Sequence, residues 1–194
     1  MRAASAIKPK TCKVCHCEFK PFLSTAKVCS QACALTLGPA LRAKAVKAEA
    51  VKEKRADRVK LDAMRTKPQL VALAQQAFNG FIRARDAGKV CISCGEPLQS
   101  ARTGGAFDCG HYRSVGSAVH MRFVEDNAHG QCKHCNRHLA GNHVAYRMKL
   151  IERIGARSVD LIEGDQVLRK YTKEGLLEIG RHYRAETRKM QAAL

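Results

Sequence analysis

The hydrophobic positions of the chain predict helices in its N-terminal third and at its C-terminal end. Residues 40–66 are rich in Ala, Lys, Arg and Glu and contain no Gly or Pro, which favours a helix, although their apolar stripe is poor. From Pro68 onward, apolar residues recur at helical spacing, and Gly88 is a candidate C-cap. Helical spacing returns in residues 158–194, where Thr172 is a candidate N-cap. We expect the C-terminal helices to cover a core or to contact a partner.

The pattern changes in the central segment, residues 89–143, where short strands and turns are predicted. Residues 106–113 and 119–124 fit two strands joined by a Gly/Ser turn. A helix is then predicted from Asn136, with its apolar side chains on one face and Gly155 at its end. The predicted fold class is therefore α+β.

Composition adds a strong electrostatic signal. The 194 residues include 35 Lys and Arg against 17 Asp and Glu, a net charge of +18. The excess positive charge lies on both sides of a central segment whose net charge is close to zero. This distribution suits a protein that binds phosphates from several sides. Because the chain has no Trp and few other aromatic residues, base stacking is not expected to be its main binding mode. A nucleic acid is the expected partner.

The sequence also indicates a reducing, cytosolic location. No apolar run reaches the length of a membrane span, and the basic N-terminus lacks the apolar segment of a secretory signal. In a cytosolic protein, ten cysteines indicate metal binding rather than disulfides. We therefore expect no membrane association.

Eight of the ten cysteines form two sets with the spacing of zinc ligands. The first set is a C-x2-C pair followed by a C-x3-C pair, with His16 and Cys17 beside it as spare ligands: Cys12, Cys15, Cys29 and Cys33. The second set is two C-x2-C pairs, 37 residues apart: Cys91, Cys94, Cys132 and Cys135. Four thiolates close a tetrahedral zinc site and leave no position for water, so both zinc ions are expected to be structural.

The segment between and just after the second pairs carries the residues of possible catalytic interest. Six of the eight histidines fall between His111 and His143, interleaved with Asn and close to Asp108. Imidazole is a base near neutral pH, and carboxylate and amide oxygens suit Mg²⁺ or Mn²⁺. Hydrolysis of a phosphodiester needs both an activated water and a cation. The alternative is that these residues are surface or DNA-facing groups and a helix N-cap at Asn136.

These residues carry a resemblance to a known family. The second cysteine set, with Asp108, His111, Asn127 and Asn136, resembles the zinc-containing HNH, or ββα-metal, endonucleases, including phage endonuclease VII. More closely, GHYRS (110–114), RFVEDN (122–127), QCKHCNRHLAGN (131–142) and the N-terminal cysteines resemble the phage NinG (Rap) recombination family. Members of that family are described as structure-specific endonucleases. The resemblance implies a zinc-stabilised ββα-metal core with helical arms and a small N-terminal zinc knuckle.

The resemblance also implies roles for individual residues. His111 would be the general base that activates water, and Asn127 would orient its ring. Asn136 and Asp108 would bind the catalytic Mg²⁺ or Mn²⁺. The expected DNA contacts are Arg113, Arg122, Lys133, Arg137 and Asn142.

Asp108 departs from the family pattern, in which the acid directly precedes the histidine. Here Cys109 and Gly110 intervene, and on a regular strand Asp108 and His111 face opposite sides. Both could reach one ion only if Cys109-Gly110 formed a bulge or a turn, which Gly permits. The alternative ligands that could complete the metal shell are His138 and His120.

The expected function is a metal-dependent endonuclease that cuts branched recombination intermediates, such as Holliday junctions, D-loop-like DNA or flaps, in the cytoplasm of a phage's bacterial host. Two nicks per junction would favour a homodimer. The alternatives are a non-catalytic zinc-finger protein that binds nucleic acid, and an HNH nuclease acting on ordinary duplex. The expected organisation is a zinc module at 1–38, a basic helix at 39–67, a nuclease core at 68–155 and a helical segment at 156–194.

Overall fold

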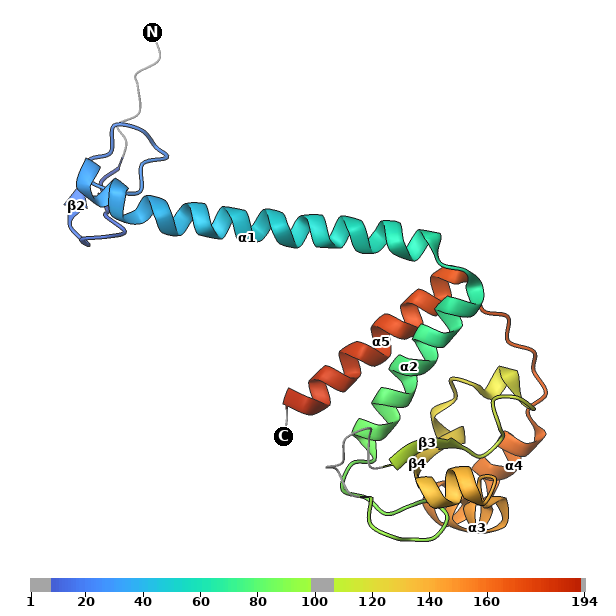
Figure 1. Ribbon diagram of the computed structural model, residues 1–194. Coiled ribbons are helices and arrows are strands. Elements are labelled where there is room, and N and C mark those ends of the chain that lie inside the picture. Colours follow the sequence, from blue (N-terminus) through green and yellow to red (C-terminus); the bar gives the residue numbers. More distant parts are fainter. Residues whose placement is uncertain (1–7, 99–106, 193–194) are drawn as a thin grey trace. The chain divides into compact units, whose positions relative to one another are not determined.

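The computed structural model describes residues 8–98 and 107–192 (Figure 1). The fold is mixed α+β, mostly helical with two small sheets, so the predicted fold class is confirmed at that level. The chain forms two compact units, Met1–Ala63 and Met64–Leu194. Across the described residues, no helix combines the length and the apolar character needed to cross a membrane.

The first unit contains a small sheet and a long helix. Strands β1 (Lys10–Thr11) and β2 (Glu18–Phe19) pair antiparallel, and α1 follows at Gln31–Met64. This helix begins upstream of the predicted start and continues through Pro39. All 34 of its residues are at least partly exposed, as the poor apolar stripe predicts.

The second unit is organised around two paired helices, α2 (Lys67–Arg85) and α5 (Lys173–Ala192) (Figure 1). Phe78 and Phe81 of α2 stack against the ring of Tyr183 of α5. The start of α2 is fixed by a capping box between Thr66 and Gln69. The hydroxyl of Thr172 accepts a hydrogen bond from the backbone N–H of Gly175 at 3.0 Å, which confirms the predicted N-cap of α5.

A two-stranded antiparallel sheet lies beside α2. Strand β3 is Phe107–His111 and β4 is Ala128–Cys132, with Asp108 opposite Gln131 and His111 opposite Ala128. The predicted strand at 119–124 is wrong: this segment begins with a short 3-10 helix, η1 (Val119–Met121), and a second one, η2 (Glu125–Asn127), leads into β4. Ala106, predicted to begin the first strand, lies outside the described residues.

A buried carboxylate ties this sheet to α2. Asp86, at the end of α2, is 0 % exposed and accepts a hydrogen bond from the backbone N–H of Gly130 in β4 at 2.7 Å. The neighbouring Arg85 donates to both Asp86 and the carbonyl of Ala128. Hydrogen bonds from Arg85 and Lys89 outweigh burial and hold the pKa of Asp86 far below its ordinary value. The carboxylate charge of Asp86 is thus paired inside the protein, and its hydrogen bonds fix the position of α2 relative to β4.

The helices that follow β4 cover the other face of the sheet. A one-turn π-helix, η3 (His134–His138), precedes α3 (His143–Ile154) and α4 (Ala156–Gly164). The helix predicted from Asn136 to Gly155 is therefore two helices, because Ala140 and Asn142 have left-handed backbone angles between them.

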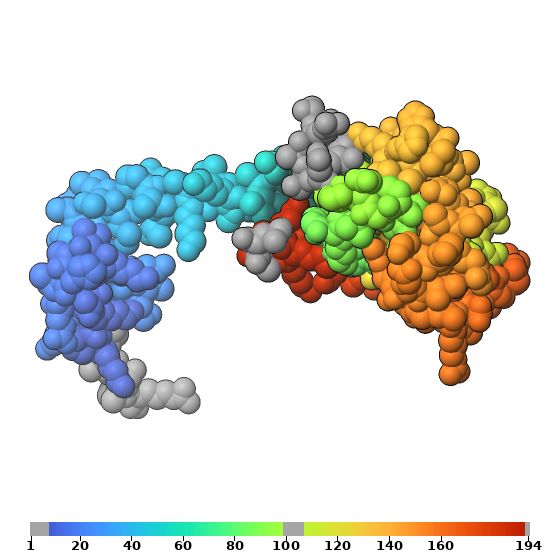
Figure 2. Space-filling model, turned by 90° about the horizontal axis from the view of Figure 1, so that it is seen from below, coloured from blue at the N-terminus to red at the C-terminus, as the bar shows by residue number. Residues whose placement is uncertain are grey.

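The cysteine knuckle near Ile92 packs against α3. Ile92 forms one cluster with Tyr146 and Leu150, and in Figure 2 the green residues of this segment lie against the orange residues of α3. Helices α4 and α5 pack on α3 and α2, so residues 156–194 belong to the same compact unit as the predicted core.

Candidate functional site

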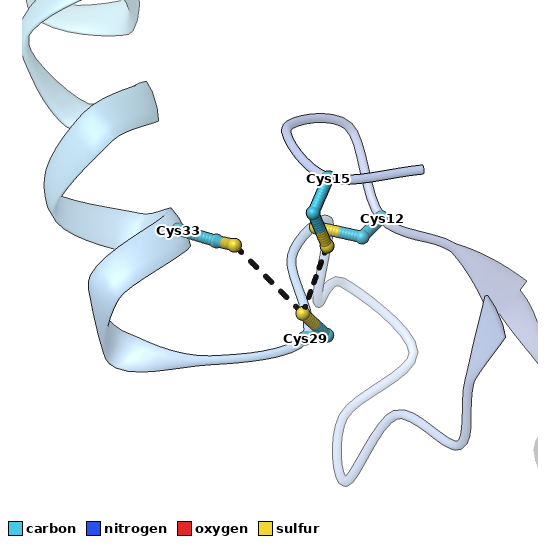
Figure 3. A group of neighbouring side chains, drawn as sticks. All are labelled: Cys12, Cys15, Cys29 and Cys33. Carbon is cyan, nitrogen blue, oxygen red and sulfur yellow. Dashed lines mark hydrogen bonds between the residues drawn. The ribbon is translucent and has the colours of Figure 1, made fainter. Parts of the chain in front are cut away.

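The first cysteine set converges in the structure as its spacing predicts. The ligand atoms of Cys12, Cys15, Cys29 and Cys33 lie within 4.8 Å of one another, and Figure 3 shows their side chains pointing toward a common centre. Hydrogen bonds from the backbone near Cys15 lower the pKa of Cys12 to about 6, which favours the thiolate that zinc binds. Cys17 lies outside this group. These four residues could hold one zinc ion.

The second cysteine set converges in the same way, between the knuckle before β3 and the end of β4. The sulfur atoms of Cys91, Cys94, Cys132 and Cys135 lie within 4.8 Å of one another. Backbone N–H groups of Cys132 and Cys135 donate to the sulfurs of Cys91 and Cys132 at 3.3 and 3.4 Å. The set could hold a second zinc ion, which would join segments far apart in the sequence.

Asp108 and Asn136, which the family resemblance implies as ligands of one ion, lie in contact. The side-chain amide of Asn136 donates to Asp108 at 3.0 Å. Asp108 is also held by the guanidinium of Arg137, whose Nε and Nη2 donate to Oδ2 and Oδ1 at 2.6 and 2.8 Å. Burial raises the pKa of Asp108, but the hydrogen bonds from Arg137 and Asn136 outweigh it and lower the pKa overall. The carboxylate is therefore ionised at neutral pH.

His111 lies at the end of β3 in a fixed orientation. Its Nε2 is 3.1 Å from the carbonyl oxygen of Arg122, and its ring lies against Phe78 of α2 with centroids 5.8 Å apart. Because a carbonyl only accepts, Nε2 carries the proton and Nδ1 of the neutral ring keeps its lone pair. Burial lowers the pKa of His111 below 6.5, although backbone hydrogen bonds with Arg122 and Cys109 oppose this shift. The ring is thus a neutral base at pH 7.

Asn127 is fully buried, but its side chain contacts backbone rather than the ring of His111. Its Oδ1 accepts from the N–H of Arg113 at 2.8 Å, and its Nδ2 donates to the carbonyls of Arg113 and Met121 at 3.0 and 3.3 Å. It therefore holds the two ends of the loop between β3 and η1. Asn127 therefore acts on His111 indirectly: it holds Met121, and the carbonyl of the next residue, Arg122, is bonded to the His111 ring.

The structure does not bring Asp108 and His111 to one point. All five residue pairs of the β3–β4 ladder are in regular register, including Cys109 with Gly130 and Gly110 with His129. Side chains alternate along a regular strand, so Asp108 faces η3 and α3 whereas His111 faces α2. The bulge or turn that a shared ion requires is not present in this ladder.

The alternative metal ligands also lie elsewhere. His120 is buried, with Nε2 2.8 Å from the carbonyl of Asp165. The ring of His138 lies on the exposed surface of η3 beside His134, with centroids 5.9 Å apart. Cys109 packs in the apolar core beside α2, where burial raises the pKa of its thiol to about 12. Such a thiol stays protonated at neutral pH, which does not suit a metal ligand.

The predicted DNA contacts divide into two groups. Arg113 donates to the carbonyls of Ile162 and Asp165 and so stabilises α4 rather than facing solvent. Asn142 precedes α3, with its amide against the sulfur of Cys135. The remaining three keep partly exposed side chains: Arg122, Lys133 and Arg137.

Gln131 was not singled out by the sequence. It is fully buried, and its Nε2 donates to Ser93 in the knuckle at 2.7 Å and to the carbonyl of Gly141 at 2.6 Å. A Cβ on Gly110 would lie 2.2 Å from its Oε1, so only glycine fits there. In the sequence, the position of the polar Gln131 between Gly130 and the zinc-type Cys132 could have indicated that its side chain forms buried hydrogen bonds.

Comparison with known proteins identifies the family. A family model described as bacteriophage lambda NinG protein matches residues 4–192. The protein NinG of Salmonella phage P22 is 42% identical over 137 residues, which cover 70% of this chain and 65% of that protein. The NinG proteins of Escherichia phages lambda and 933W are each 41% identical over 137 residues, 70% of this chain and 65% and 66% of theirs.

The matched region thus spans slightly less than two thirds of these relatives. No solved structure matches the chain. The family model covers nearly all of the sequence, including both cysteine sets and the β3–β4 sheet. The chain therefore belongs to the bacteriophage NinG family.

Proposed function

We propose that this chain is a metal-dependent DNA endonuclease that cuts branched recombination intermediates in the cytoplasm of the bacterial host. The observation that carries the proposal is the state of His111. Its Nε2–H is held by the carbonyl of Arg122, its pKa is lowered by burial, and its Nδ1 keeps a lone pair at neutral pH. A fixed neutral imidazole is suited to general-base chemistry.

In this proposal His111 removes a proton from a water molecule that attacks the phosphodiester. The new imidazolium shares its Nε2 proton with the Arg122 carbonyl, which stabilises the positive charge. Asn127 keeps the loop carrying that carbonyl in place through its bonds to Arg113 and Met121. The ring orientation is thus set before substrate binds, which limits the reorganisation needed at the moment of reaction.

The Asp108–Asn136 pair fits an oxygen-preferring cation by its chemistry. An ionised carboxylate lies beside an amide, and rotating the amide of Asn136 by half a turn would direct its oxygen, rather than its NH₂, toward Asp108. These two residues would hold Mg²⁺ or Mn²⁺, and such an ion would neutralise a phosphate on their own face of the sheet rather than the phosphodiester beside His111. The fit is partial, because Arg137 occupies the carboxylate and His111 lies on the other face of the sheet.

That separation favours a second candidate function, a non-catalytic zinc protein that binds nucleic acid. In that case Asp108 and Arg137 form a surface ion pair, and Asn136, which lies within η3 and not at its N-cap, donates a hydrogen bond to the same carboxylate. Both cysteine sets and the net charge of +18 suit this candidate equally well.

The test is a cleavage assay with the full chain on a labelled four-way junction, a flap and a plain duplex, with and without Mg²⁺ or Mn²⁺. His111→Ala is compared with His134→Ala, which removes an exposed histidine from η3. We expect metal-dependent cleavage, preferentially of branched DNA, that His111→Ala abolishes and His134→Ala retains. If no substrate is cleaved, the endonuclease proposal is wrong and the nucleic-acid-binding protein is favoured. If plain duplex is cleaved as fast as branched DNA, the chain is a nuclease without a preference for branches.

Resolution of a junction requires two nicks, so we also propose that the active form is a homodimer. Light scattering of the chain alone and bound to a four-way junction would measure the number of chains. One chain per junction under conditions of full cleavage would contradict the dimer.

A further inference from the structure

A groove of about 470 Å³ with a mixed apolar and polar lining runs along α2 in the second unit. Val71 and its neighbours form its apolar end, and the rest is lined by amide and guanidinium groups: Gln75, Gln76, Asn79, Arg83 and Arg122. None of the described residues that line it is acidic. The groove lies on the side of the sheet that faces α2, the same side as His111.

The two arginines of the groove differ from four other arginines of the unit, although not from Arg157, in having no carboxylate partner among the described residues. Among the described residues, neither Arg83 nor Arg122 forms an ion pair. By contrast, four arginines of the unit are paired with carboxylates: Arg85, Arg137, Arg147 and Arg169. Both groove arginines are only partly exposed, so their charges are incompletely hydrated and lack an anion. Two such guanidinium groups in one groove suit an anionic group shared between them.

The amides hold part of this arrangement in place. Nη1 of Arg122 donates to Oε1 of Gln75 at 3.2 Å, and Nε2 of Gln75 donates to Oδ1 of Asn79 at 2.7 Å. This chain orders the Arg122 side chain before any ligand arrives. Among the described residues no acceptor is seen for the Asn79 amide N–H groups, which could meet a sugar or a base edge.

The groove is also connected to the proposed base. The carbonyl of Arg122 accepts the hydrogen bond of His111, and the Arg122 side chain lines the groove. Arg83 lies at the other end, two residues before Arg85, whose guanidinium donates to the carbonyl of Ala128, the ladder partner of His111. Arg83 and Arg122 therefore line a groove on the helix against which the His111 ring packs.

We propose that this groove binds a DNA strand, with one phosphodiester between Arg83 and Arg122 and the adjoining nucleotide over the amides of α2. The inference rests on the proposed function for its substrate class, and it places the strand on the α2 side of the sheet, not on the Asp108–Asn136 side. Of the five DNA contacts predicted from the sequence, Arg122 lines this groove and none lies on α2.

The test measures binding without cleavage, by fluorescence anisotropy of a labelled four-way junction in buffer without added Mg²⁺ or Mn²⁺. Arg83→Gln removes one groove cation, and Arg157→Gln removes the same charge from the exposed surface of α4. We expect Arg83→Gln to weaken binding about tenfold and to reduce the slope of log K against log salt by about 1. Arg157→Gln should change both much less. Equal effects of the two variants would overturn the proposal.

A second measurement does not depend on the loss of an interaction. The photo-crosslinking residue p-benzoylphenylalanine replaces Gln76, which is exposed at the groove, or Arg157 as the control. Irradiation with the junction should crosslink DNA at position 76 and not at 157, and thermal unfolding checks that each variant is folded. Crosslinking at both positions or at 157 alone would contradict the groove.

These outcomes separate the groove from the nuclease. If the groove binds DNA and the chain cuts nothing with any metal, the endonuclease is wrong and the binding site stands. If the chain cuts branched DNA while Arg83→Gln binds and cuts as wild type does, the nuclease stands and the groove is wrong.

Discussion

The imidazole of His111 is bonded to the carbonyl of Arg122, a residue eleven positions away whose side chain bonds to α2. The backbone of Arg122 thus fixes the tautomer of the proposed base, while its guanidinium contacts Gln75 in the α2 groove. One residue therefore links the ring that would activate water to the surface that would hold the substrate strand.

The state of His111 predicts the acid side of the pH–rate profile. A general base works unprotonated, and burial lowers the pKa of His111, so its inflection should lie below the ordinary value of 6.5. Cleavage should rise with pH to a plateau before neutrality. Phe78→Leu, which removes the ring beside His111, should move the inflection upward toward 6.5. Single-turnover cleavage rates from pH 5 to 8 measure both, and an inflection above 6.5 in the unmodified chain would contradict this role.

The two cysteine sets predict a metal content of two zinc ions per chain. Cys12→Ser and Cys135→Ser should each reduce it to one, because each removes one of four converging thiolates. Cys135→Ser should also unfold the second unit, since its zinc would join the knuckle to β4. Plasma emission spectrometry gives the stoichiometry and circular dichroism the fold.

Two further cysteines serve as controls for the zinc prediction. Cys17 and Cys109 lie outside both groups, so Cys17→Ser and Cys109→Ala should keep two zinc ions. Loss of zinc from Cys17→Ser would show that the first site uses a different fourth ligand.

Asn127 predicts a large loss of stability for a single polar side chain. Its amide makes three hydrogen bonds to the backbone of Arg113 and Met121 while fully buried. Asn127→Ala leaves these groups unpaired, and we expect it to lower the free energy of unfolding by about 2–4 kcal/mol. Urea unfolding of the zinc-loaded chain measures this. Asn136→Ala, which loses one bond at a partly exposed site, should cost under about 1 kcal/mol, and a similar cost for both would contradict the loop-holding role.

Elements set by local chemistry could be predicted from the sequence. Each C-x2-C or C-x3-C pair, the helical repeat of α2 and the Thr172 cap depend on residues within a few turns of one another, and the structure has all three. The β4 strand could not be predicted in this way. Its residues, Ala-His-Gly-Gln-Cys, include no β-branched side chain, and its place is set by Asp86 and the cysteine set, which are distant in sequence.

The candidate site also combines features that could be predicted from the sequence with features that depend on the fold. That Asp108 and Asn136 would lie together was implied by the resemblance to the HNH endonucleases, and in the structure the amide of Asn136 donates to Asp108. Which face of the strand His111 occupies depends on the register of the ladder, and a shift by one residue would reverse it. The groove of α2 looks in the sequence like an ordinary solvent-facing stripe. Only the fold shows that Arg122 of a distant loop completes it.

The pairing of Asp108 with Arg137 predicts how the proposed cation site responds to mutation. The guanidinium of Arg137 donates to both carboxylate oxygens of Asp108, so it competes with any cation that Asp108 and Asn136 would hold. Arg137→Ala should therefore raise Mn²⁺ affinity about tenfold, equivalent to about 1.4 kcal/mol. Asp108→Asn should abolish binding at this site. Manganese titrations followed by electron paramagnetic resonance measure both.

A control must separate competition at the carboxylate from a general change in charge. Arg157→Ala removes the same charge from α4, so it should raise Mn²⁺ affinity far less than Arg137→Ala. Equal gains in the two variants would mean that Arg137 acts only through net charge. Retained binding in Asp108→Asn would exclude Asp108 as a ligand and place the cation elsewhere. Because zinc would occupy the cysteine sets, the titration must start from zinc-loaded protein, so that Mn²⁺ bound to thiolates is not counted.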